Sequence, residues 1–219
     1  DALYEPFLLN NIEELPALLQ ANPTIQGLNV TIPYKEAVLP YLDELDNTAE
    51  EIGAVNCIVF RNGKKKGYNT DSIGFEQSLV PFLQPQHTHA LILGTGGSSK
   101  AVAYVLKQLG IAYRFVSRAK QHDYLVYEEL TPEIISQHKL IINTTALGMY
   151  PNVESAPALP YEAISAQHLL YDLIYNPEET LFLARGKERG AAIKNGFEML
   201  QLQADASWEI WSISRNVPG

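Results

Sequence analysis

Two segments of the chain each carry a charged side chain of a type that can take part in proton transfer. Lys35 follows a short apolar stretch, and Asp71 stands at the expected start of a helix. An ammonium held beside a carboxylate can orient a substrate, donate a proton and stabilise negative charge that builds on an oxygen atom. Considered one at a time, Lys35 fits a solvated helix lysine and Asp71 fits an N-cap, so only their placement in the fold could bring out this chemistry.

A glycine-rich turn offers a second functional element. The segment Gly94-Thr95-Gly96-Gly97-Ser98-Ser99 follows the apolar run 90–93 and precedes a helical stripe of apolar residues. Glycines at such a turn let the backbone approach a pyrophosphate, which then faces the free N–H groups of the helix N-terminus. A phosphate loop of the NTPase kind would need Gly at position 99 and Ser or Thr at position 101, where the chain has Ser99 and Ala101. Dinucleotide binding is therefore favoured over that alternative and over a plain strand-to-helix turn.

The next expected strand ends at Ser117-Arg118, with Lys120 just beyond. Folds that bind NAD place an acidic residue about 20 residues after the glycines, where it contacts the ribose hydroxyls. A guanidinium at that place can instead hold a 2′-phosphate with two hydrogen bonds. Arg118 thus favours NADP over NAD, and the alternative is a surface arginine that happens to follow a strand.

Composition excludes several other classes of protein. The chain has 219 residues and a net charge of −9, which argues against binding to nucleic acid or to an anionic membrane surface. No apolar run approaches the ~20 residues of a membrane-spanning helix, and no signal peptide is visible. The single cysteine, Cys57, suits a reducing cytosol. Of the five histidines, His87 and His89 are interpreted as surface residues, and no metal site is predicted.

The pattern of apolar residues predicts an α/β fold in which residues 71–196 form a Rossmann-like parallel sheet. Residues 1–70 are expected to mix strands and helices, with a hairpin turning at Asn62-Gly63 and a short helix capped by Asp46. The domain boundary is placed near Asp71, on a connecting helix. The expected strands are 4–9, 27–32, 54–61, 65–68, 90–93, 111–117, 140–143 and 169–174, and the expected helices are 11–21, 33–42, 71–82, 101–109, 132–137, 178–187 and 197–215.

Seven segments, taken in chain order, resemble the shikimate dehydrogenases. The resemblance covers nearly the whole chain, which no isolated motif could produce. The segments are Asn29 to Lys35 (NVTxPxK), Gly53 to Cys57 (GAVNT, with cysteine for threonine), Asn69 to Gly74 (NTDxxG), Gly94 to Ala101 (GxGGxxxA), Asn143 to Met149 (NTTxxGM), Asp172 to Leu181 (DxxYxPxxTxL) and Gly196 to Ala204 (GxxMLxxQA).

The resemblance implies an NADP-dependent oxidoreductase that interconverts 3-dehydroshikimate and shikimate, in the cytoplasm, as a monomer or homodimer. It implies a substrate domain of residues 1–70 with 197–219, the C-terminal helix packing back on it. Lys35 and Asp71 would be catalytic. The substrate would contact Thr31, Asn56, Tyr175 and Gln203, and the cofactor would contact Gly94, Gly96, Gly97, Ser117, Arg118, Thr145, Met149 and Gly196.

Two departures from the family pattern stand out. The family's Asn-Arg-Thr beside the cofactor is Ser117-Arg118-Ala119 here, and nothing matches its N-terminal Ser-x-Ser pair that binds the substrate carboxylate. Because the chain starts at Asp1 and not at Met, we expect a preceding segment that this sequence does not include. The alternatives that remain are an NAD-using quinate/shikimate dehydrogenase and a non-catalytic relative that senses a metabolite. A methylene-tetrahydrofolate dehydrogenase lacks support from the segments around Asn56 and Gln203.

Overall fold

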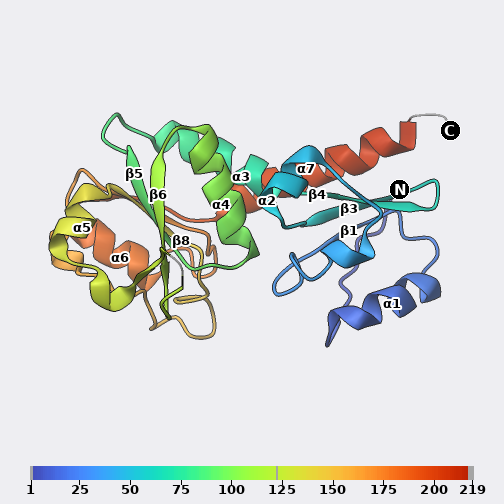
Figure 1. Cartoon of the computed structure of the whole chain (residues 1–219), viewed down its shortest axis with the longest axis horizontal. Coiled ribbons are helices and arrows are strands. Elements are labelled where there is room, and N and C mark those ends of the chain that lie inside the picture. Colours follow the sequence, from blue (N-terminus) through green and yellow to red (C-terminus); the bar gives the residue numbers. More distant parts are fainter. Residues whose placement is uncertain (1, 122, 217–219) are drawn as a thin grey trace.

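Two separate β-sheets organise the chain, with helices between them (Figure 1). The computed structural model describes residues 2–121 and 123–216, so Asp1, His122 and residues 217–219, the end of the predicted range 197–219, lie outside it. The first sheet has the strand order β1-β3-β4-β2, and the second has the order β10-β9-β8-β5-β6-β7. The predicted α/β architecture with a parallel-sheet part is confirmed.

The first sheet contains β1 (Gly27–Asn29), β2 (Glu44–Leu45), β3 (Cys57–Arg61) and β4 (Lys64–Tyr68). β3 pairs antiparallel with β1 and β4, and β2 runs parallel to β4. Asn62 and Gly63 both have positive φ at the predicted β3–β4 turn, as a tight hairpin requires. Asp46 accepts a hydrogen bond from Thr48 N and so caps α2 (Asn47–Ile52), as predicted. The N-terminal part also contains η1 (Ile12–Glu14), α1 (Leu15–Ala21) and η2 (Leu39–Tyr41).

All neighbouring strands of the second sheet are parallel. The chain moves outward from β5 to β6 and β7, then returns to the other side of β5 for β8, β9 and β10. Ligands of such sheets bind outside the carboxyl ends of the strands where the order reverses, here between β5 and β8. The strands are β5 (His89–Leu93), β6 (Ala112–Ser117), β7 (Leu125–Val126), β8 (Leu140–Asn143), β9 (Leu169–Asp172) and β10 (Ala192–Lys194).

Helices cover both faces of this sheet (Figure 1), so its central strands β5, β8 and β9 are buried except for His89 at the start of β5. Alternate strand residues such as Ile92 and Leu91 belong to different apolar clusters on the two faces. The helices are α3 (Asp71–Leu79) with η3 (Val80–Phe82), α4 (Gly97–Gln108), α5 (Pro132–Gln137), α6 (Leu181–Glu188) and α7 (Phe197–Asn216), with η4 (Tyr127–Glu129) and η5 (Tyr161–Ala163) between them.

The C-terminal helix joins the two sheets. α7 packs along α3 and reaches β3, where Trp211 Nε1 donates a hydrogen bond of 3.0 Å to the Ile58 carbonyl. A Cβ on Gly27 would lie 2.3 Å from that indole nitrogen, so β1 needs glycine where α7 crosses it. The predicted return of this helix to the first part of the chain is confirmed. The division into residues 1–70 with 197–219 and residues 71–196 stays a prediction.

Three local expectations are wrong. Residues 4–9 form no strand, and the side chains of Leu3, Tyr4 and Leu8 are largely exposed. Residues 33–42 form turns and a 3-10 helix, because Pro40 has no N–H to continue a helix through this segment. His87 is buried and not a surface residue. Within the described residues, no group of three or more His, Cys, Asp or Glu side chains is arranged to hold a metal ion.

Candidate active site

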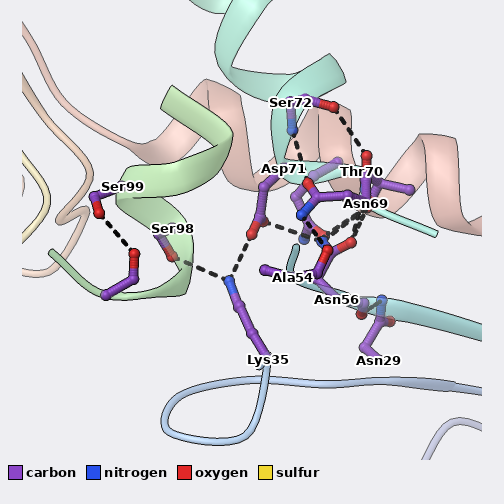
Figure 2. A network of polar contacts seen from close by, with 12 residues as sticks. Asn29, Lys35, Ala54, Asn56, Asn69, Thr70, Asp71, Ser72, Ser98 and Ser99 are labelled. Carbon is purple, nitrogen blue, oxygen red and sulfur yellow. Dashed lines mark hydrogen bonds and ion pairs between the residues drawn. The ribbon is translucent and has the colours of Figure 1, made fainter. Parts of the chain in front are cut away.

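The side chains of Lys35 and Asp71 meet although the two residues are 36 positions apart in the sequence (Figure 2). Lys35 Nζ lies 2.6 Å from Asp71 Oδ2, and the two side chains are 13% and 7% exposed. Lys35 comes from the turn after β1, and Asp71 is the first residue of α3. Because the pair is mostly withdrawn from water, its electrostatic interaction is screened less than that of the exposed ion pairs elsewhere on the molecule.

A buried amide holds the carboxylate in place. Asn56 Nδ2 donates to Asp71 Oδ1 at 3.0 Å and approaches Thr70 Oγ1 at 2.9 Å. Asn56 Oδ1 accepts the Thr70 backbone N–H at 2.7 Å. Gln203 Oε1, on α7, lies 3.3 Å from the same Asn56 amide. The two carboxylate oxygens of Asp71 therefore have different partners, Lys35 on one and Asn56 on the other.

Two further polar residues, which the sequence analysis missed, extend this network. Ser207 Oγ lies 3.0 Å from Thr70 Oγ1 and accepts from Asn29 Nδ2 at 3.1 Å. Ser207 follows Gln203 by four positions, which places both on one face of α7. That spacing is the signal that could have identified Ser207, and the NTD segment that contains Thr70 is the signal for Thr70.

The glycine turn lies directly against Lys35. Lys35 Nζ approaches Ser98 Oγ, in the first turn of α4, at 3.2 Å (Figure 2). A Cβ on Gly97 would come within 3.0 Å of Lys35 Cβ, so glycine permits this close approach. The sequence analysis did not assign Ser98 to the site. The helix N-terminus that would face a phosphate and the ammonium that would face a substrate are thus neighbours.

The residues around the turn fit a dinucleotide. Gly94 follows β5 with a φ of 109°, and a Cβ there would lie 2.7 Å from Thr144 Oγ1, the residue after β8. An added Cβ on Gly96 would meet nothing within 4 Å, so the backbone at the N-cap of α4 faces open space. A pyrophosphate could approach the free N–H groups of α4 from that side. The turn occupies the reversal point between β5 and β8.

The end of β6 places Arg118 on the surface, one position beyond Ser117. The Ser117 hydroxyl donates to the Ala119 carbonyl within its own loop. Lys120 Nζ forms an ion pair with Glu129, at 2.7 Å and 2.8 Å from the two carboxylate oxygens. Arg118 is therefore better placed than Lys120 to meet an added phosphate.

Comparison with known proteins identifies the family. Residues 1–58 match the family model described as the shikimate dehydrogenase substrate binding domain. A protein of Methanosphaera stadtmanae named shikimate dehydrogenase (NADP(+)) is 39% identical, over 97% of this chain and 81% of that protein. The chain belongs to the shikimate dehydrogenase family.

Solved structures of shikimate dehydrogenases have the same fold. The Aquifex aeolicus enzyme is 36% identical, with a TM-score of 0.82 over 95% of this chain and 80% of that one. The Thermus thermophilus enzyme, solved in complex with NADP(H) and shikimate, is 31% identical, with a TM-score of 0.81 over 93% of this chain and 79% of that one.

Four further residues singled out by the family resemblance lie on loops between the regular elements. Thr31 is exposed after β1, and Tyr175 and Met149 are 49% and 46% exposed. Gly196 is buried and tightly packed, since a Cβ there would lie 2.1 Å from the Leu173 carbonyl oxygen. The roles of Thr31, Tyr175, Met149 and Gly196 stay predictions.

The buried carboxyl group of Asp172 supports the loop after β8. This loop contains Thr145, which the family resemblance assigns to the cofactor site. Thr145 Oγ1 donates to Asn143 Oδ1 at 2.7 Å, and Asn143 Nδ2 donates to Asp172 Oδ1 at 3.1 Å. Asp172 also accepts from Ile174 N at 3.0 Å and from Thr180 Oγ1 at 2.6 Å. Burial raises the pKa of Asp172 to about 6, and these hydrogen bonds oppose the rise only in part.

We expect Asp172→Asn to remove a pH dependence from the stability of the protein. With the folded pKa raised above the unfolded value of 3.8, the native state binds the extra proton, so wild-type stability falls as pH rises from about 4 to about 6. The amide has no proton to lose and keeps the shape of the carboxyl group. The free energy of unfolding of the variant, relative to that of wild type, should rise by up to about 3 kcal/mol between pH 4 and pH 7.

Urea unfolding of both proteins at several pH values measures this difference. The matched control is Asp205→Asn, which changes an exposed carboxylate on α7. If the difference in free energy of unfolding between wild type and Asp172→Asn did not change across this pH range, the raised pKa would be contradicted.

Proposed function

We propose that this protein catalyses the reversible, NADP(H)-dependent reduction of 3-dehydroshikimate to shikimate. The observation that supports it best is the contact of the Lys35–Asp71 pair with the first turn of α4, which brings an acid–base pair to the edge of a dinucleotide fold. The names of the relatives agree with this chemistry. Placement in aromatic amino acid biosynthesis and in the cytoplasm belongs to the same proposal. No helix among the described residues is long and apolar enough to cross a membrane.

Lys35 and Asp71 handle the proton in this mechanism. An NADP(H) held at the glycine turn would supply the hydride for reduction and accept it for oxidation. As the ring ketone is reduced, negative charge builds on its oxygen, and the Lys35 ammonium is placed to stabilise that charge. Asp71 holds the ammonium at 2.6 Å and can hydrogen-bond a substrate hydroxyl.

The amide network behind the pair would give the site its selectivity. Asn56 already contacts both Gln203 and Asp71, so a ring hydroxyl that binds there joins hydrogen bonds that are positioned in advance. A buried polar group that loses its partner discriminates strongly against a substrate that lacks the matching hydroxyl. We therefore expect a polyhydroxylated ring acid as substrate rather than a simple alcohol.

The departure from the family pattern at Ser117-Arg118-Ala119 supports a second candidate function. Ser117 is engaged with Ala119, so Arg118 would recognise a 2′-phosphate with less help than the Asn-Arg-Thr pattern supplies. This favours, as the alternative, a quinate/shikimate dehydrogenase that uses NAD. A relative that only senses a metabolite would have little use for the buried Lys35–Asp71 pair.

The test is a spectrophotometric assay of shikimate oxidation, followed through the absorbance of the reduced nicotinamide, with NADP⁺ and NAD⁺ compared at equal concentration. Turnover with NADP⁺ that exceeds turnover with NAD⁺ supports the proposal. A kcat/KM for quinate with NAD⁺ that exceeds the kcat/KM for shikimate with NADP⁺ would favour the alternative. Binding of shikimate without turnover would favour the sensor.

A further inference from the structure

Lys35 has a second partner on the cofactor side of the site. Its Nζ lies 3.2 Å from Ser98 Oγ, besides 2.6 Å from Asp71 Oδ2. We propose that Ser98 is a positioning residue, whose hydroxyl aims the Lys35 ammonium and ties its orientation to the N-terminus of α4. This inference rests on the proposed function, because it assigns Ser98 a part in the reaction of Lys35.

The geometry of an ammonium group shows why one hydroxyl matters. A lysine Nζ carries three donors in tetrahedral directions on a flexible stem. Asp71 takes one donor and Ser98 takes a second, so the direction of the third is fixed. Without Ser98 the ammonium could rotate about the contact with Asp71. The third N–H is then the one left to point at the oxygen of a substrate.

The first turn of α4 is itself held against the lysine segment. Lys100 Nζ forms an ion pair of 2.5 Å with Glu36, the residue after Lys35. Ala101 and Tyr104 pack in an apolar cluster with Ile52 and Ala54. Residues of α4 therefore contact the first part of the chain along one face. A shift of this N-terminus on binding a phosphate would move Ser98, and with it the ammonium.

The neighbouring serine provides a comparison within the same turn. Ser99 Oγ donates to the Gly96 carbonyl at 2.7 Å, so its hydroxyl supports the glycine turn and not Lys35 (Figure 2). Removing the Ser99 hydroxyl should act on cofactor affinity through the shape of the turn. Removing the Ser98 hydroxyl should act on the reaction itself. The two losses are therefore distinguishable.

Steady-state kinetics test the assignment with Ser98→Ala, Ser98→Thr and Ser99→Ala. Ser98→Ala should lower kcat about 10-fold, the scale of one hydrogen bond to a charged group. Its deuterium isotope effect on kcat, for shikimate labelled at the hydride-donating carbon, should exceed that of wild type. KM for NADP⁺ should stay within about threefold. Ser98→Thr keeps the hydroxyl and should recover most of the lost kcat. A kcat unchanged in Ser98→Ala, or a loss in Ser98→Thr just as large, would overturn the proposal.

A second measurement does not need turnover. Acetic anhydride acetylates exposed amines, and mass spectrometry of peptides gives the rate at each lysine. Ser98→Ala should raise the acetylation rate of Lys35 several-fold relative to that of the exposed Lys107, whereas Ser99→Ala should leave it nearly unchanged. Equal Lys35 rates in all three proteins would refute the Ser98 contact. A wild-type protein with protected Lys35 but no oxidation of shikimate would refute the proposed function and leave the contact standing.

Discussion

Replacing Lys35 by alanine should lower kcat for shikimate oxidation by about 10²–10⁴-fold, the usual contribution of a positioned acid or base. The variant loses the ammonium that lies 2.6 Å from Asp71 Oδ2 and leaves a partly buried carboxylate without that partner. KM for NADP⁺ should change much less, because the pyrophosphate would meet the backbone of the glycine turn. Initial rates at saturating shikimate and NADP⁺ measure the effect.

The matched control is Lys107→Ala. Lys107 forms an exposed ion pair of 2.8 Å with Glu51, far along α4 from the site, and its side chain is 66% exposed. Surface pairs of this kind contribute little, so kcat should stay within about twofold of wild type. If Lys35→Ala raised KM for shikimate but kept kcat, Lys35 would be a binding residue and the proposed mechanism would be wrong.

Asp71 provides an internal check on this prediction. If the two side chains act as one unit, Asp71→Asn and Lys35→Ala should each cost much of the rate, and the double variant should be little worse than either one. Losses that multiply would mean that the two residues act independently, which their 2.6 Å separation argues against.

Most of the fold prediction came from the pattern of apolar residues along the chain. The buried strands β5, β8 and β9 are apolar runs of four or five residues bounded by polar or small residues, and their short length favours a strand over a buried helix. β7 and β10 escaped notice because they are two and three residues long, too short to show a period. Residues 4–9 are mostly apolar, as a short strand can be, but the segment pairs with no other strand of the described chain, and strand pairing depends on tertiary structure.

The candidate site, like the fold, could be predicted from the sequence only in part. Residue type alone left Lys35, Asp71 and Asn56 with ordinary structural interpretations, and the resemblance of their segments, taken in order, to the family pattern singled them out. The contact between Lys35 and Ser98 could not be predicted, because it depends on how closely α4 approaches a turn 63 residues earlier in the chain. Local patterns predict which elements form, whereas side-chain hydrogen bonds between distant segments appear only once those elements have packed.

Arg118→Ala should weaken NADP⁺ binding by about 10–100-fold, the scale of charge-assisted hydrogen bonds to a phosphate. Arg118 stands exposed just after β6, where we propose that its guanidinium binds the 2′-phosphate. NAD⁺ lacks that phosphate, so its affinity should change by less than about threefold, and the preference between the cofactors should fall by nearly the whole loss. Calorimetric titration with each cofactor measures both affinities without relying on turnover.

Lys120→Ala tests whether any nearby cation would serve as well. Lys120 lies two residues beyond Arg118, but Glu129 already holds its ammonium with both carboxylate oxygens. Its loss should therefore weaken NADP⁺ binding far less than the loss of Arg118. The protein carries a net charge of −9, so its overall field opposes a dianionic phosphate and a local cation must overcome that repulsion. An equal drop in NAD⁺ and NADP⁺ affinity in Arg118→Ala would mean that Arg118 supports the loop or the adenine and does not read the phosphate.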